Sequence, residues 1–193
     1  MQAEGKVETE TITQQAADIE AAGWTRRRAG PFMQAIGPLW ARRAEQNWQY
    51  GLLAGEQHLN PAGVVHGGLL QALIDHALSA LAWDAAGRAP CVTLQADTQF
   101  LAPVRAGDFI VAQGSVMQRT RGLVFMHGQL AVTGQPVLNS QAIFKIAKHA
   151  ARRQDSPEAN GSRTRQHPDF GSINCISTNI EPNPQKQSER ARP

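Results

Sequence analysis

Residues 60–86 read NPAGVVHGGLLQALIDHALSALAWDAA, and this stretch decides the fold. Asn60, Pro61 and Gly63 predict a turn at its start. From His66 to about Ala86 the chain has no proline and is rich in leucine and alanine, which favours a helix about 30 Å long. Steps of about 100° per residue gather the apolar side chains on one stripe, which we expect to bury against a sheet: Leu69, Leu70, Leu73, Ile74, Ala77 and Leu81.

The start and the polar face of this helix carry candidate chemistry. Gly67 and Gly68 are poor helix formers, so their position suggests that the backbone must come close to something. Free N–H groups of a first helical turn suit an oxygen that becomes negative, and Gly67 is the candidate donor. Asp75 points away from the apolar stripe, where it could act as base or nucleophile. Taken alone, such glycines are more often packing devices, and such an aspartate is usually solvated.

The rest of the chain predicts an α+β fold. A helix is expected over residues 12–22 and a helical turn over 31–37, followed by a possible hairpin of strands 38–44 and 48–55. Four further runs have strand character, at 91–101, 108–117, 123–133 and 137–147. Because short turns separate them, we expect consecutive strands to pair antiparallel as a meander.

At these residues the chain resembles a known family, the phenylacetic-acid-degradation (PaaI-like) branch of the hotdog-fold thioesterases. In that family an Asn, a His-Gly-Gly and a later Asp form the site, and Asn60, His66-Gly67-Gly68 and Asp75 match them. Thr93 matches the Ser or Thr that begins the strand after the helix. Further agreement follows in the same order, at Asp97, Phe100, Pro103 and Gly107. The resemblance implies a long central helix wrapped by a curved antiparallel sheet.

The resemblance also implies an activity, the hydrolysis of acyl- or aryl-acyl-CoA to free acid and CoA. The Gly67 N–H, assisted by Asn60, would polarise the thioester carbonyl, and His66 would help the thiolate to leave. Asp75 and Thr93 of a neighbouring subunit would activate water, although direct attack by Asp75 to give an anhydride stays open. Each site would then lie between subunits of a homodimer or homotetramer.

Substrate contacts follow from the same resemblance. Gly68, Arg105, Arg119 and Arg121 are candidates for binding the substrate, the arginines through CoA phosphates. Leu39, Trp40 and Phe100 could line an acyl pocket or belong to ordinary core. No metal and no cofactor is expected, since CoA is part of the substrate and Cys91 and Cys175 lack metal-site spacing.

Composition sets the domain organisation and excludes some partners. We expect an N-terminal extension over 1–30, a hotdog domain over 31–149, and a polar, disordered tail over 150–193. The formal net charge is +3, and the tail holds seven basic against five acidic residues, leaving twelve against eleven elsewhere. A nearly neutral body does not favour nucleic acid. No apolar run approaches the ~20 residues of a membrane span, so a cytoplasmic protein is expected.

Three other functions compete with hydrolysis. A hotdog dehydratase or hydratase would act on hydroxyacyl thioesters through a His-Asp pair, but the Asn60 and Thr93 matches favour hydrolysis. A non-catalytic acyl-CoA sensor would not need Asp75. Nucleic-acid binding by residues 26–28 (Arg-Arg-Arg) and the basic tail rests on a charge run alone.

Overall fold

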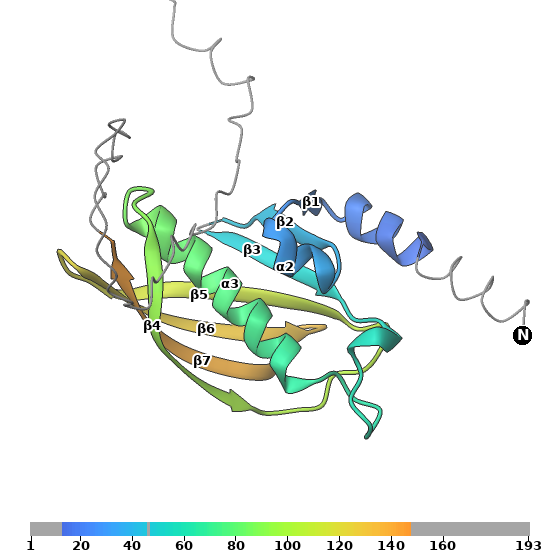
Figure 1. Cartoon of the computed structure of the whole chain (residues 1–193). Helices are drawn as coiled ribbons and strands as arrows, with labels where there is room; N and C mark the ends of the chain where they lie inside the picture. Colours follow the sequence, from blue (N-terminus) through green and yellow to red (C-terminus); the bar gives the residue numbers. More distant parts are fainter. Residues whose placement is uncertain (1–12, 46, 148–193) are drawn as a thin grey trace, which may run out of the picture.

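The computed structural model describes residues 13–45 and 47–147, and the expected tail lies outside them. Residues 13–21 are helical, as predicted. No helix of the described ranges is long and apolar enough to cross a membrane. The remaining elements, in chain order (Figure 1), are β1 (Thr25–Arg27), α2 (Gly30–Ala35), β2 (Leu39–Arg43), β3 (Trp48–Leu53), the 3-10 turn η1 (Glu56–His58), α3 (Gly67–Ala85), β4 (Cys91–Phe100), β5 (Phe109–Arg119), β6 (Leu123–Val132) and β7 (Gln135–Ile146).

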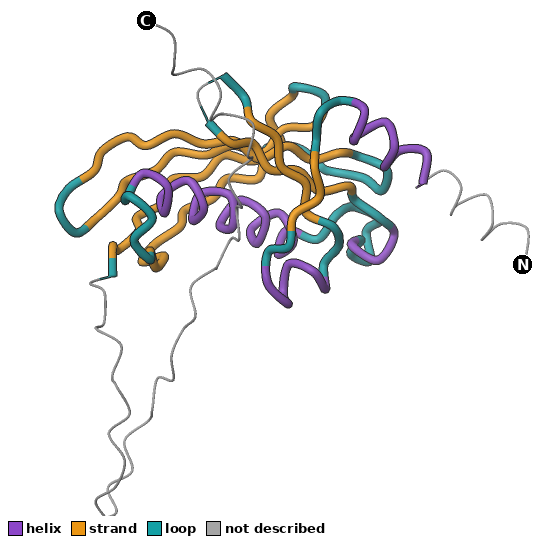
Figure 2. The backbone as a smooth tube through the Cα atoms, turned by 90° about the horizontal axis from the view of Figure 1, so that it is seen from above, coloured by secondary structure: helices purple, strands orange, loops and turns teal. Residues whose placement is uncertain are grey.

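One long helix lies against one face of a single antiparallel sheet, which confirms the α+β hotdog architecture. The strand order is β1-β2-β3-β5-β6-β7-β4, and α3 crosses one face of this sheet (Figures 1 and 2). Every residue of the predicted apolar stripe is buried there. The sheet wraps so far round the helix that His76, Leu78, Ser79 and Ala82, which lie off the stripe, are buried too.

The helix approaches the sheet most closely over two glycines. Gly114 of β5 and Gly128 of β6 are direct cross-strand partners, and Leu78 of α3 lies over both. A Cβ at Gly114 would lie 2.4 Å from Leu78 Cδ2, and one at Gly128 would lie 2.7 Å from the same atom. Real Cβ atoms do not make contacts this short, so a side chain at either position would force Leu78 to shift; at Gly114 the backbone carbonyl oxygen of His127 is also only 2.9 Å away.

The predicted meander is correct for the last three strands and wrong for the first. β5, β6 and β7 pair consecutively, but β4 pairs with β7 and not with β5. The physical reason is the path of the chain, which leaves the sheet after β3, near the middle of the strand order, and crosses the face of the sheet as α3. The chain therefore enters β4 at the far edge, and β5 returns to lie beside β3. The predicted hairpin of β2 and β3 is confirmed.

A second, smaller apolar cluster lies on the sheet face opposite α3. Residues of the 13–21 helix pack there with Trp24 and Trp40 against Phe109 and Val111 of β5. Arg26 and Arg42 then cover the indole rings, with guanidinium carbons 4.7 Å from the Trp40 centroid and 4.5 Å from the Trp24 centroid. The charge run at 26–28 is therefore partly a short edge strand whose arginines stack on tryptophans. The sheet thus begins before residue 31.

The main core contains one titratable pair. His76 of α3 meets Tyr50 of β3 edge to face, with ring centroids 5.8 Å apart, and His76 Nε2 has no hydrogen-bond partner within the described ranges. Burial lowers the pKa of His76 to about 4. Burial, reinforced by the charge of Asp84, raises the pKa of Tyr50 to about 12. Both side chains are therefore neutral at pH 7.

We expect Gly114→Ala to lower the free energy of unfolding by about 1–3 kcal/mol, because the added methyl must push Leu78 and the helix away from the sheet. Gly122→Ala is the matched control, since nothing lies within 4 Å of a Cβ there and its backbone is not in the left-handed region. Chemical denaturation of both variants measures the difference. Equal midpoints would contradict the close packing.

We expect acid to destabilise the fold through His76. Its pKa is about 4 in the folded protein and 6.5 in the unfolded chain, so the unfolded state binds more protons between these values. The stabilisation is complete above pH 6.5 and is lost as the pH falls towards about 4. In His76→Gln, the free energy of unfolding should fall less between about pH 7.5 and about pH 5 than it does in the wild type, as measured by denaturation at both pH values. His127→Gln, at an exposed position, should leave the wild-type slope, and an unchanged slope in His76→Gln would refute this assignment.

Candidate active site

His66 fixes the start of α3. It is the N-cap residue, and its Nδ1 accepts a 2.9 Å hydrogen bond from the Gly68 N–H. Nδ1 therefore carries a lone pair, so the proton of the neutral ring is on Nε2. The Gly67 N–H has no acceptor in the part of the chain that the structure describes. Of the two adjacent glycines, Gly67 is thus the one that presents an unpaired donor, at the positive end of the helix dipole.

The Gly67 position is covered by an aromatic ring. A Cβ there would lie 3.2 Å from two ring carbons of Phe100, at the end of β4. Phe100 is 54% exposed, so its other side is available to a ligand or to a second copy of the chain. The missing side chain at Gly67 therefore serves close contact with this ring.

Asn60 holds the turn that precedes the helix. Its Oδ1 accepts from the Ala62 N–H at 2.9 Å and from the Val64 N–H at 3.4 Å. The Val65 N–H then bonds the Val104 carbonyl, which ties the turn to the loop after β4. With its oxygen used in the turn, the Asn60 amide has Nδ2 left as a donor, and no described residue accepts from it.

Asp75 and Thr93 meet, as the sequence interpretation required. The Thr93 hydroxyl donates to Asp75 Oδ1 at 2.8 Å, and both side chains are half-buried. Thr93 stands at a β-bulge, since the pairing of β4 with β7 shifts register between Thr93 and Gln95. A bulge re-aims a side chain, and here it accompanies the turn of the hydroxyl towards α3.

A second polar pair, which the sequence analysis did not identify, lies one helical turn earlier. Thr98 of β4 donates to Gln71 Oε1 of α3 at 2.9 Å. Gln71 lies four residues from Gly67 and four from Asp75, which places all three on one helix face. This spacing could have identified Gln71 as a site candidate from the sequence alone. We call the contact of these residues with β4 the α3–β4 seam: Gly67 with Phe100, Gln71 with Thr98, and Asp75 with Thr93.

The two ends of the seam are too far apart to serve one thioester. Gly67 and Asp75 are eight residues apart, which is about 12 Å along a helix. An oxyanion donor and a water-activating carboxylate each need a hydrogen bond of about 3 Å, one to the thioester oxygen and one to the water that attacks the same carbon. In a single copy the candidate oxyanion donor and the candidate carboxylate are therefore too far apart to contact one thioester.

The three predicted CoA-binding arginines do not gather in one copy. Arg105 follows Val104 in the loop that bonds Val65, at the end where α3 begins. Arg119 and Arg121 belong to the end of β5 and the turn after it, which lies at the opposite end of the sheet (Figure 1). All three side chains are exposed.

Of the three acyl-pocket candidates, only Phe100 lies at the seam. Leu39 is buried in the core beneath α3, and Trp40 is buried in the cluster on the other sheet face. Both are therefore core residues in the single chain. Their apolar character was compatible with either role, and the alternation of β2 decides which face each one takes.

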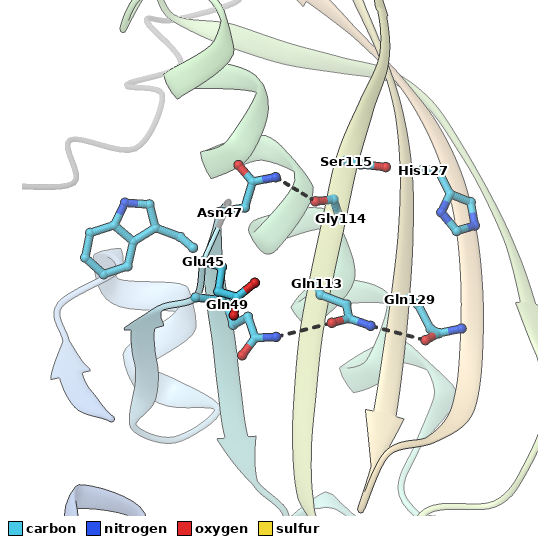
Figure 3. A pocket seen from close by; sticks show the side chains of 10 residues that line it. Glu45, Asn47, Gln49, Gln113, Gly114, Ser115, His127 and Gln129 are labelled. Atoms are coloured by element: carbon cyan, nitrogen blue, oxygen red, sulfur yellow. Dashed lines mark hydrogen bonds between the residues drawn. The ribbon is translucent and has the colours of Figure 1, made fainter. Parts of the chain in front are cut away.

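Two cavities of about 480 and 470 Å³ lie away from the seam. Figure 3 shows the first, where Gln49, Gln113 and Gln129 form a hydrogen-bonded row across β3, β5 and β6. Gln113 lies between Ala112 and Gly114, which face α3, so the row is on the opposite sheet face. Neither cavity is lined by a residue predicted to be catalytic. No group of metal-ligating side chains occurs among the described residues.

Comparison with known proteins agrees with this geometry. The family model described as "Thioesterase superfamily" matches residues 62–136, and no curated protein matches the chain. The TT0310 protein of Thermus thermophilus is 27% identical with a TM-score of 0.54, and the alignment covers 61% of this chain and 98% of that one. A point mutant of the phenylacetic acid degradation protein PaaI from the same organism is 26% identical with a TM-score of 0.54, covering 61% and 100%.

A more distant structure shares the fold. A hypothetical thioesterase of Streptococcus pneumoniae, solved with coenzyme A, is 18% identical with a TM-score of 0.52, and the alignment covers 56% of this chain and 87% of that one. The matched residues contain the start of α3, Asp75, Thr93 and the whole seam. With its long helix on an open antiparallel sheet and this match, the chain is similar to hotdog-fold proteins of the thioesterase superfamily, PaaI among them.

Proposed function

We propose that the protein hydrolyses an acyl-CoA thioester, with Asp75 as the general base and the Gly67 N–H as the oxyanion donor. The observation that carries this is the seam itself, which holds an unpaired backbone donor at one end and a carboxylate paired with a hydroxyl at the other. A thioester needs little protonation of its leaving group, so one donor site and one carboxylate can suffice. The solved thioesterase with coenzyme A supports the same substrate class.

The chemistry follows from the hydrogen bonds of the resting site. The Gly67 N–H and Asn60 Nδ2 donate to the thioester oxygen as it becomes negative. Asp75, oriented by Thr93, takes a proton from the water that attacks the carbonyl carbon. The carbon–sulfur bond then breaks, the His66 Nε2–H donates a hydrogen bond to the departing thiolate, and the proton that Asp75 took from water leaves with the products. Direct attack by Asp75, giving an anhydride that water cleaves, would use the same residues.

A homodimer would complete this site. Because one copy leaves about 12 Å between donor and carboxylate, Asp75 of a second, antiparallel copy must face Gly67. β4 suits such a contact, since it is the edge strand beyond β7 and exposes Val92 and Leu94. An antiparallel arrangement would also bring Arg119 and Arg121 of one copy towards Arg105 of the other, where CoA phosphates would bind. A tetramer would pair two such dimers.

Asp75→Asn is expected to lower kcat/KM for thiol release from a panel of aryl, short-chain and medium-chain acyl-CoAs by at least about 10²-fold. Asparagine keeps the shape and can still accept from Thr93, so the loss isolates the negative charge. Asp84→Asn, an exposed change on the same helix, should retain wild-type rates. A folded wild type that releases no thiol from any member of the panel would refute hydrolysis and favour a dehydratase or a sensor.

Sharing of sites can be tested by mixing two inactive variants. Asp75→Asn and Asn60→Ala should each be inactive alone, yet co-expressed chains should recover activity at about a quarter of the sites, where intact Asn60 and Gly67 of one chain meet intact Asp75 of the other. The thiol-release assay on purified mixtures measures this recovery. A mixture no more active than its components would show that each site is built within one chain.

A further inference from the structure

Gln71, in the middle of the α3–β4 seam, has a half-used amide group. Its Oε1 accepts from the Thr98 hydroxyl at 2.9 Å, which fixes the orientation of the side chain. Its Nε2 carries two N–H donors, and no residue of the described ranges accepts from either. Gln71 is half-buried and its Nε2 remains within reach of solvent, so an acceptor on a bound ligand can take the place of water there.

The amide lies beside the place where the thioester carbonyl would bind. Steps of about 100° per residue put Gln71 between Gly67 and Asp75 around the helix. Helical side chains lean back over the preceding turn, so the Gln71 amide leans towards Gly67. It therefore lies within one helical turn of the oxyanion donor.

The exposure of the helix start indicates which part of the substrate passes Gln71. His66 and Gly68 are exposed, as is Arg105 in the adjoining loop, so this side offers a path for the large and charged CoA portion. Gln71, Asp75 and Thr93 are half-buried further along the seam. The acyl group, on the other side of the carbonyl, is then directed along α3 over the Gln71 amide.

We propose that Gln71 is a specificity-determining residue that selects acyl groups bearing a neutral hydrogen-bond acceptor at carbon 3, as in a 3-oxoacyl-CoA. This inference rests on the proposed thioester hydrolysis. An oxygen at carbon 3 lies a few ångströms from the thioester carbonyl, within the one-turn spacing of the two donors. A plain alkyl chain would leave the Nε2 donors unpaired, and a carboxylate would be repelled by Asp75.

The test compares 3-oxohexanoyl-CoA with hexanoyl-CoA for the wild type, Gln71→Leu, Thr98→Val and Gln113→Leu, by thiol release. The measured quantity is the ratio of the two kcat/KM values within each enzyme, so the fraction of folded protein cancels. The ratio should fall about tenfold in Gln71→Leu, which cannot donate, and should also fall in Thr98→Val, where the amide is no longer held. Gln113→Leu, on the opposite sheet face, should keep the wild-type ratio.

Each outcome decides between the two claims. A ratio unchanged by Gln71→Leu, with thiol released from both substrates, overturns the role of Gln71 and leaves the hydrolase standing. An equal loss on both substrates, with a shift towards monomer in analytical ultracentrifugation, also overturns it, because Gln71 would then serve contact between copies. Absence of thiol release from both substrates by the wild type would instead remove the proposed function on which the inference rests.

Discussion

The rest of the structure depends on the contact of Leu78 with the paired glycines Gly114 and Gly128. It sets the distance between α3 and the sheet, because side chains at those two positions would hold the helix away. The hydrogen bonds from Thr93 to Asp75 and from Thr98 to Gln71 join the same helix to β4 at the edge of the sheet, and they need its position to within a few tenths of an ångström. Close packing in the core therefore positions polar groups at the edge of the molecule.

The seam joins a buried element to an edge strand, so its polar groups lie at the surface of the single chain. Most of the α3 surface is buried in the core, whereas β4 has β7 as its one strand neighbour among the described residues. Polar groups that face outwards along the seam are thus rigidly placed yet accessible. The two cavities described above lie elsewhere, so the proposed site of the single chain is an open surface and not one of these cavities.

Sequence reasoning located the helix, its buried stripe and the meeting of Asp75 with Thr93, because helical periodicity and a shared motif fix these locally. It could not pair β4 with β7, since alternation marks a strand but not its neighbour. It also missed the strand at Thr25–Arg27, whose charged residues disguise an edge strand stacked on tryptophans. The role of Gly114 and Gly128 depends on which residue crosses above them, and a single sequence does not reveal that.

The two edges of the sheet differ in a way that bears on assembly. At one edge stands a strand of three residues whose arginines are engaged with aromatic rings, and at the other a strand of ten residues with bare backbone and exposed Val92 and Leu94. A short, charged edge resists pairing with another chain. A sheet that can grow on one side only would stop after a single joining event, so edge pairing would join two copies and would not build a fibre.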